Sequence, residues 1–120
     1  MIEKPTYALL IYRTAPLEPA PENSERALQG HRTLQKEASA SGDLHAVAKL
    51  AGVDTSKTVR RRTGAHDVTD GPYIDTKEWL VGFYLLDCAD EEEALARART
   101  ICPVDDHVIE VRPVDWRWKP

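Results

Sequence analysis

The chain has 120 residues, the length of one ordinary domain, and we expect a single domain over residues 1–120. Its 20 acidic residues outnumber the 16 basic ones and give a formal net charge of −4 at pH 7. That balance argues against nucleic acid or an anionic membrane as a partner, because both require a positive surface. No apolar run approaches the roughly 20 residues that cross a bilayer, and the N-terminus lacks a basic leader and a small-residue cleavage site. We therefore expect a cytoplasmic protein.

The first third of the chain predicts a strand, a loop and a helix. Residues 6–12 form a continuous apolar and aromatic run, as expected for a central strand that is covered on both faces. Three prolines in residues 15–21 indicate a loop. Asn23 or Ser24 can then cap a helix that continues until Gly42 stops it.

His31 occupies an inward position on this predicted helix. The apolar residues repeat at helical spacing, and His31 lies on the same stripe, between Ala27 and Leu34. The imidazole is either a functional proton donor and acceptor or a core side chain bonded to a backbone carbonyl or to Tyr12.

The middle of the chain predicts a second strand and a hairpin. Residues 44–50 have strand composition, and residues 58–62 and 66–69 form two further strands joined by a tight turn. This hairpin delivers Asp70 to the edge of the core.

The last third predicts a strand, a helix and a final strand. Residues 80–88 are the most hydrophobic segment and predict a central strand. Asp90 and Glu93 have the spacing of a capping box, and the helix that follows ends before Pro103. Residues 107–114 alternate loosely and close the sheet.

The order of elements matches an α+β, split βαβ arrangement, with both helices on one face of a largely antiparallel sheet. The strands at 6–12 and 80–88 are apolar on both sides, so the other face needs a cover. A second copy of the sheet is the simplest cover, which predicts a homodimer. Trp116 and Trp118 are either anchors of that interface or side chains that fold back onto their own subunit.

The stretch most indicative of a functional loop is TDGPY at residues 69–73, followed by TKE at residues 76–78, because it combines turn residues with ionisable side chains. Asp70 can bond a downstream amide, Gly71 allows a positive φ, and Pro72 fixes the direction of the chain. The Asp70 carboxylate is therefore held in place, either for chemistry or only to cap its own turn.

Four blocks in this order resemble the YCII-related, DGPF-type family. They are YALLIY at residues 7–12, TDGPY at 69–73, GFYLLD at 82–87 and EVRPV at 110–114. The resemblance implies a ferredoxin-like fold, pairing of two subunits into a dimeric α/β barrel, and an activity that is mostly unassigned. The chain departs from the family pattern at Arg61, Tyr73 and Asp75.

The resemblance also implies a dyad of Asp and His. Asp70 lies within the matching motif, and His31 corresponds to a histidine that members frequently carry in the same helix. A carboxylate that orients an imidazole makes it a competent general acid or base near neutral pH. Asp70 and His31 are therefore the candidate catalytic residues.

Six further side chains are candidates for binding a substrate. Lys77 and Glu78 follow the motif closely enough to reach the same cavity, although such charges are often only a solvated surface. Arg60 and Arg62 lie on the same side of their strand and match the paired arginines of the family. One of them could clamp a carboxylate or phosphate of a ligand, or form an ion pair with Asp70 or Glu110. Hydroxyl and guanidinium donors at strand and turn ends complete the set: Tyr12, Arg13 and Tyr73.

No cofactor or metal is predicted. The sequence contains no phosphate-binding glycine loop, G-x-S-x-G motif or H-E-x-x-H motif. Cys88 and Cys102 lack redox or metal spacing and are expected to be structural thiols. The triplet at residues 105–107 could touch a metal ion, but a surface turn before the last strand explains it equally well.

Two functional hypotheses follow. In the first, Asp70 and His31 of a small homodimer move protons on a small polar or aromatic metabolite, in a lyase, isomerase or dehydrohalogenase-like reaction. In the second, the protein is a non-catalytic ligand-binding, regulatory or protein-interaction module, because DGPF-type domains also occur attached to sigma-factor-like regulators. The first hypothesis predicts turnover, and the second predicts binding without turnover.

Overall fold

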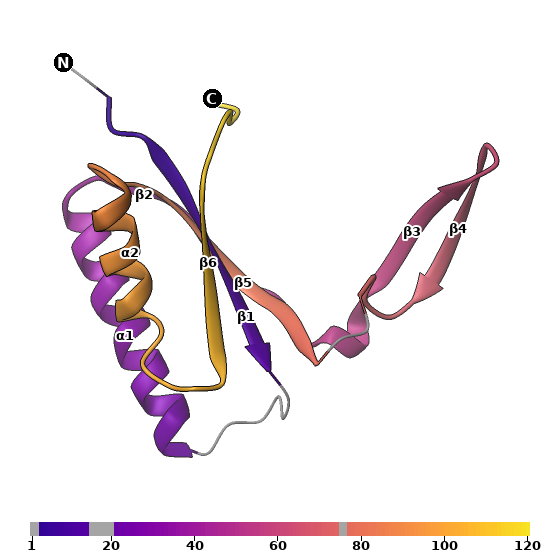
Figure 1. Cartoon of the computed structure of the whole chain (residues 1–120), viewed down its shortest axis with the longest axis horizontal. Coiled ribbons are helices and arrows are strands. Elements are labelled where there is room, and N and C mark those ends of the chain that lie inside the picture. Colours follow the sequence, from indigo (N-terminus) through magenta and orange to yellow (C-terminus); the bar gives the residue numbers. More distant parts are fainter. Residues whose placement is uncertain (1–2, 15–20, 75–76) are drawn as a thin grey trace.

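A computed structural model describes residues 3–14, 21–74 and 77–120, so the predictions for Asp75 and for the proline-rich loop over residues 15–20 lie outside the described residues. The described chain is α+β, with two helices and a mostly antiparallel sheet (Figure 1). Neighbouring strands of the main sheet are all antiparallel, in the order β2-β5-β1-β6. These strands are β1 (Thr6–Thr14), β2 (Leu44–Lys49), β5 (Glu78–Asp87) and β6 (His107–Pro113).

Both helices, α1 (Pro21–Ala40) and α2 (Glu91–Thr100), lie on one face of this sheet (Figure 1). Helix α1 begins before the predicted caps, at a proline, which suits a first turn because its missing N–H would have no helical partner there. Gly42 follows the helix with a φ of 77°, as the sequence predicted for the residue that stops it. Within the described residues, neither helix has the length and apolar character needed to span a membrane.

The core lies between the helices and the sheet. Alternate residues of β1 are buried beneath the helices, among them Leu9 and Ile11. Leu34 of α1 and Tyr84 of β5 are completely buried against them. The predicted inward stripe of α1 is therefore confirmed at Ala27, Leu34 and Ala38, whereas Leu28, which the same pattern includes, is 43% exposed.

The predicted hairpin forms, but it stands apart from the main sheet. Strands β3 (Lys57–Arg62) and β4 (Ala65–Asp70) pair only with each other in the described structure, and they project away from the helices (Figure 1). A short 3-10 helix, η1 (Val53–Thr55), precedes them. The apolar pair Val59 and Val68 is exposed, so the hairpin has no apolar face that its own subunit buries.

A buried ion pair links α2 with the start of β2 and the end of β5. Asp43, next to the start of β2, accepts a hydrogen bond from Nη2 of Arg97 at 2.9 Å, and Arg97 also donates from Nη1 to the backbone oxygen of Asp87 at 2.6 Å. Ser41 and Lys4 bond the same carboxylate. Burial alone would raise the pKa of Asp43, but the hydrogen bonds from Arg97, Ser41 and Lys4 hold it below its usual range.

The C-terminal tail does not bury its tryptophans. Trp116 and Trp118 are 76% and 70% exposed, so the alternative in which they fold back onto their own subunit is wrong for this structure. The tail is tied down by polar contacts instead, with Arg117 3.4 Å from Nε2 of His45 and Lys119 3.6 Å from a carboxylate oxygen of Glu3.

Candidate functional site

A cleft of about 620 Å³ lies between α1 and the helix-covered face of the sheet. Its size falls within the range of pockets that hold small organic ligands. Helix α1 forms one wall, and all four strands of the main sheet contribute side chains to the other. Its polar lining residues are Arg13, Ser24, His31, Gln35, Lys49, Tyr84 and His107.

His31 lies in this cleft and contacts Tyr84. The Nδ1 atom of His31 is 2.8 Å from the Tyr84 hydroxyl, and the two ring planes are within 4° of each other. The side-chain amide of Gln35 donates to the same hydroxyl at 3.1 Å. The hydroxyl accepts from Gln35, and it either accepts from a proton on Nδ1 or donates its own proton to Nδ1, so the contact fits both tautomers of the neutral ring.

The acidities of these groups fit that arrangement. Burial, followed by the charge of His107, lowers the pKa of His31. Burial also raises the pKa of the Tyr84 hydroxyl, against the smaller opposing effect of the Gln35 hydrogen bond. At neutral pH His31 is therefore a neutral imidazole and Tyr84 a neutral phenol, a pair that can accept or pass on a proton.

A second polar cluster lies where β1 ends beside the start of β6. Arg13 and His107 are register partners across these strands, and both line the cleft. Asp106 lies beside them, with its carboxylate oxygens 3.6 Å from Nη2 of Arg13 and 2.9 Å from Nδ1 of His107. Neither contact has the geometry of a hydrogen bond, so Nε and Nη2 of Arg13 and Nδ1 of His107 are buried without a hydrogen-bond partner among the described residues.

The pKa of His107 reflects this surrounding. Burial lowers the pKa of the imidazole, Asp106 opposes that shift, and Arg13 adds to it, with a net lowering. His107 is thus neutral at neutral pH even though a carboxylate lies beside it.

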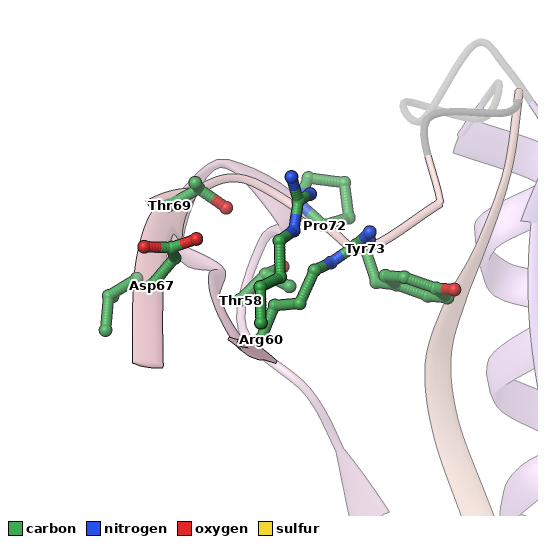
Figure 2. Close-up of a pocket in the computed structure, with 8 residues that line it drawn as sticks. Thr58, Arg60, Asp67, Thr69, Pro72 and Tyr73 are labelled. Carbon is green, nitrogen blue, oxygen red and sulfur yellow. The ribbon is translucent and has the colours of Figure 1, made fainter. Parts of the chain in front are cut away.

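The hairpin carries a separate, smaller hollow of about 370 Å³ (Figure 2). The guanidinium of Arg60 lies over the ring of Tyr73, 5.1 Å from its centroid. Figure 2 shows both side chains beside Thr58 and Pro72, on the hairpin side of the molecule. Arg60 and Tyr73, two predicted ligand-binding residues, are therefore close to each other, but they do not line the larger cleft.

Asp70 is the last residue of β4, and its carboxylate forms an exposed ion pair with Lys57 at the base of the hairpin. Gly71 follows with a φ of 99°, the positive φ that the sequence analysis allowed for this glycine. His31 contacts Tyr84 and Asp70 contacts Lys57, so the described part of this subunit does not bring the two candidate catalytic residues together.

The remaining candidates are distributed over the molecule. Arg13 lines the cleft with His31. Tyr12 belongs to the alternate set of β1 side chains, which points to the sheet face without helices. Lys77 is exposed before β5, and Glu78 is the exposed first residue of that strand.

Neither cysteine is paired, and the pKa of each thiol is raised, chiefly by burial. The described residues contain no group of three or more His, Cys, Asp or Glu side chains arranged to hold a metal ion. The triplet at residues 105–107 instead contributes His107 to the cleft and Asp106 to the cluster behind it.

Sequence reasoning missed Gln35, Tyr84 and His107 as cleft residues. Gln35 follows His31 by four residues and so shares its helix face, a signal that the sequence already contained. Tyr84 and His107 depend on strand register, which brings residues far apart in the chain into one cleft.

Comparisons with known proteins agree on one family. The family model described as YCII-related domain matches residues 6–119. An uncharacterised protein of Rhizobium meliloti (strain 1021) is 37% identical over 112 residues, which cover 90% of each chain.

Proposed function

The chain belongs to the YCII-related domain family, and from that premise we propose that it is a homodimer that binds a small polar or aromatic metabolite in the cleft beneath α1. The observation that carries the proposal is the convergence of His31, Tyr84 and Gln35 on an otherwise largely apolar cleft. A few aligned polar groups in an apolar hollow are typical of sites that orient small ligands.

His31 is the group proposed to move protons. Its lowered pKa keeps the imidazole neutral, so it can take a proton from a bound metabolite at neutral pH. In the tautomer that carries its proton on Nδ1, this nitrogen donates to the Tyr84 hydroxyl at 2.8 Å, which orients the ring and leaves Nε2 as the proton acceptor for the ligand. Proton transfer of this kind suits a lyase, isomerase or dehydrohalogenase-like reaction.

The proposed dimer uses the sheet face that the helices leave open. Leu10 and Phe83 are register partners on that face and are only half-buried within one subunit. The strand order supports a ferredoxin-like subunit, and two such sheets packed face to face would form a dimeric α/β barrel. The Asp70 turn, on the projecting hairpin, would then be free to approach the cleft of the second subunit and to orient His31 there.

The dimer is tested by sedimentation velocity on the wild type and on Phe83→Asp. A dimer that the variant converts to a monomer supports the proposal, whereas a monomeric wild type contradicts it. Ala96→Asp, on an exposed position of α2, is the matched control and should leave the oligomeric state unchanged.

The metabolite site is tested by a thermal-shift screen of a metabolite library on the wild type and His31→Asn. Ligands that bind the folded state raise its melting temperature, and we expect these shifts to disappear in His31→Asn. His66→Asn, in the exposed strand β4, is the control and should respond as the wild type does. Equal responses in all three proteins would exclude His31 from the binding site.

A second candidate function is a non-catalytic module that binds another protein. The exposure of both tail tryptophans favours it, because large exposed aromatic side chains are common anchors of protein interfaces. This function predicts binding without turnover, and replacement of Trp116 and Trp118 by Ser would abolish partner binding while leaving the metabolite response intact.

A further inference from the structure

The cleft has a charge opposite to that of the protein as a whole. The chain carries 20 acidic and 16 basic residues, yet the described residues that line the cleft include Arg13 and Lys49 and no Asp or Glu. A hollow lined by one sign of charge, with apolar walls that exclude water, concentrates ligands of the other sign.

Arg13 is a guanidinium with unused hydrogen-bonding capacity. Its side chain is 17% exposed, and its Nε and Nη2 atoms have no hydrogen-bond partner among the described residues. The carboxylate of Asp106 lies 3.6 Å from Nη2, too far for a good hydrogen bond. These two atoms are closed to solvent, so a ligand in the cleft meets the remaining exposed part of the Arg13 side chain. A partly buried guanidinium attracts an anion more strongly than a solvated one.

The cleft is also polarised across the sheet. Arg13 and His107 lie at its β1 and β6 side, while Val47, Leu50 and Val53 line the side near β2. His31 and Tyr84 lie between these two ends, on α1 and on β5. A ligand that matches this pattern has an anionic group at one end and an apolar body at the other.

We propose that the cleft selects monocarboxylic acids with an aromatic or branched aliphatic body, and that Arg13 binds the carboxylate while the side chains near β2 contact the apolar body. A carboxylate matches the planar donors of a guanidinium better than a single-point anion does. In this arrangement the carbon chain next to the carboxylate passes His31, the group proposed to move protons. The inference rests on the proposed ligand-binding function of the cleft and adds the class of ligand.

The test compares acids with their uncharged amides by isothermal titration calorimetry. The probes are benzoate, phenylacetate and isovalerate, each paired with its primary amide. We expect at least one acid to bind tighter than its amide, and Arg13→Gln to weaken that acid by roughly tenfold or more, the range for a hydrogen bond to a charged group. Arg112→Gln, on β6 and exposed, is the matched control and should keep wild-type affinity.

A measurement on the wild type removes any dependence on how the variants fold. A bound anion favours the protonated imidazole, so binding of the acid should raise the pKa of His107 in an NMR titration, and the amide should not. An unchanged or lowered pKa of His107 in the acid complex would overturn the proposal.

The outcomes separate this inference from the function on which it rests. If neutral metabolites bind in a manner that depends on His31 while none of the acids binds better than its amide, the ligand site stands and the preference for carboxylates is wrong. If Arg13→Gln binds the acids as the wild type does, Arg13 only ties β1 to β6. If neither acids, amides nor library metabolites bind, both proposals fail.

Discussion

The Nδ1 atom of His31 lies 2.8 Å from the hydroxyl oxygen of Tyr84, and this contact joins α1 to the centre of the sheet inside the cleft. Tyr84 is completely buried, so its hydroxyl depends on His31 and Gln35 for its hydrogen bonds. The same contact therefore contributes to stability and orients the imidazole that the proposed function uses.

Replacing Tyr84 by Phe should destabilise the protein by about 1–2 kcal/mol, because the change leaves polar atoms of His31 and Gln35 without their partner. Urea unfolding measures the loss. Tyr73→Phe is the control and should keep wild-type stability, because Tyr73 is exposed and contacts Arg60 through its ring. Equal stability of Tyr84→Phe and the wild type would show that the contact between His31 and Tyr84 contributes nothing.

Stability should fall as the pH drops below about 6.5, through the histidines of the cleft. Burial lowers the pKa of His31 and of His107 from the ordinary value of 6.5. The unfolded chain therefore takes up these protons at a higher pH than the folded chain does. The contribution is complete above 6.5 and is lost as the pH falls through the folded values.

The corresponding measurement is the free energy of unfolding as a function of pH, between neutral pH and about pH 5. The double variant His31→Gln, His107→Gln should show a smaller decline in the free energy of unfolding than the wild type. Some decline remains because other groups also titrate in this range. His66→Gln should retain the wild-type slope; an unchanged slope in the double variant would contradict the assignment.

Arg97→Met should destabilise the protein by about 3 kcal/mol, because it leaves the buried Asp43 carboxylate without its closest cation. Arg99→Met, on an exposed position of the same helix, should have little effect. The lowered pKa of Asp43 gives a second signature: the stabilisation is present above its ordinary value of 3.8 and is lost as the pH falls through the folded value. Similar urea midpoints for the two arginine variants would refute this account.

Gly30→Ala should destabilise the protein, although the same change in a solvent-exposed helix stabilises by about 1 kcal/mol. A Cβ atom at this position would lie 2.2 Å from the backbone oxygen of Thr100, at the end of α2. The two helices must therefore separate locally, at a cost of about 1–3 kcal/mol. Thermal unfolding provides the measurement with Gln29→Ala as the control, and a more stable Gly30→Ala would show that the helices are not in close contact there.

Much of the fold could be predicted because its signals are local. The apolar runs of β1 and β5, the N-cap at Asp90 and the glycine after α1 each depend on residues within a few positions. The hairpin could be predicted for the same reason, because its turn signal lies in adjacent residues. In the structure, Thr63 and Gly64 adopt the positive φ values that a tight turn requires.

The candidate site depends on longer-range relations, and the predictions were correspondingly weaker. Helical periodicity placed His31 on the inner face, but Tyr12 was named as a partner where the structure has Tyr84. Strand alternation sends Tyr12 to the other face of the sheet, whereas Tyr84 points toward the helices. The sequence places His107 in a triplet that a metal contact or a surface turn explains equally well. It does not reveal the cleft position, because the register partner Arg13 comes from a strand more than ninety residues earlier.

Asp70 could be placed relative to His31 only by knowing whether the hairpin pairs with the main sheet or stands apart from it. The sequence gives no local rule for this, although the hairpin has only one large apolar residue in each strand, Val59 and Val68. Strands without a continuous apolar face have little to bury against the core, which is the signal that the hairpin stands apart.

The central claim is that the cleft around His31 binds a small molecule, and imidazole NMR of labelled wild-type protein tests it most directly. The histidine resonances would be followed during titration with pools of metabolites. We predict saturable shifts of His31 and His107 with at least one compound, while His66 on the hairpin stays unchanged. Shifts confined to His66, or no saturable shift at His31 with any compound, would contradict the account.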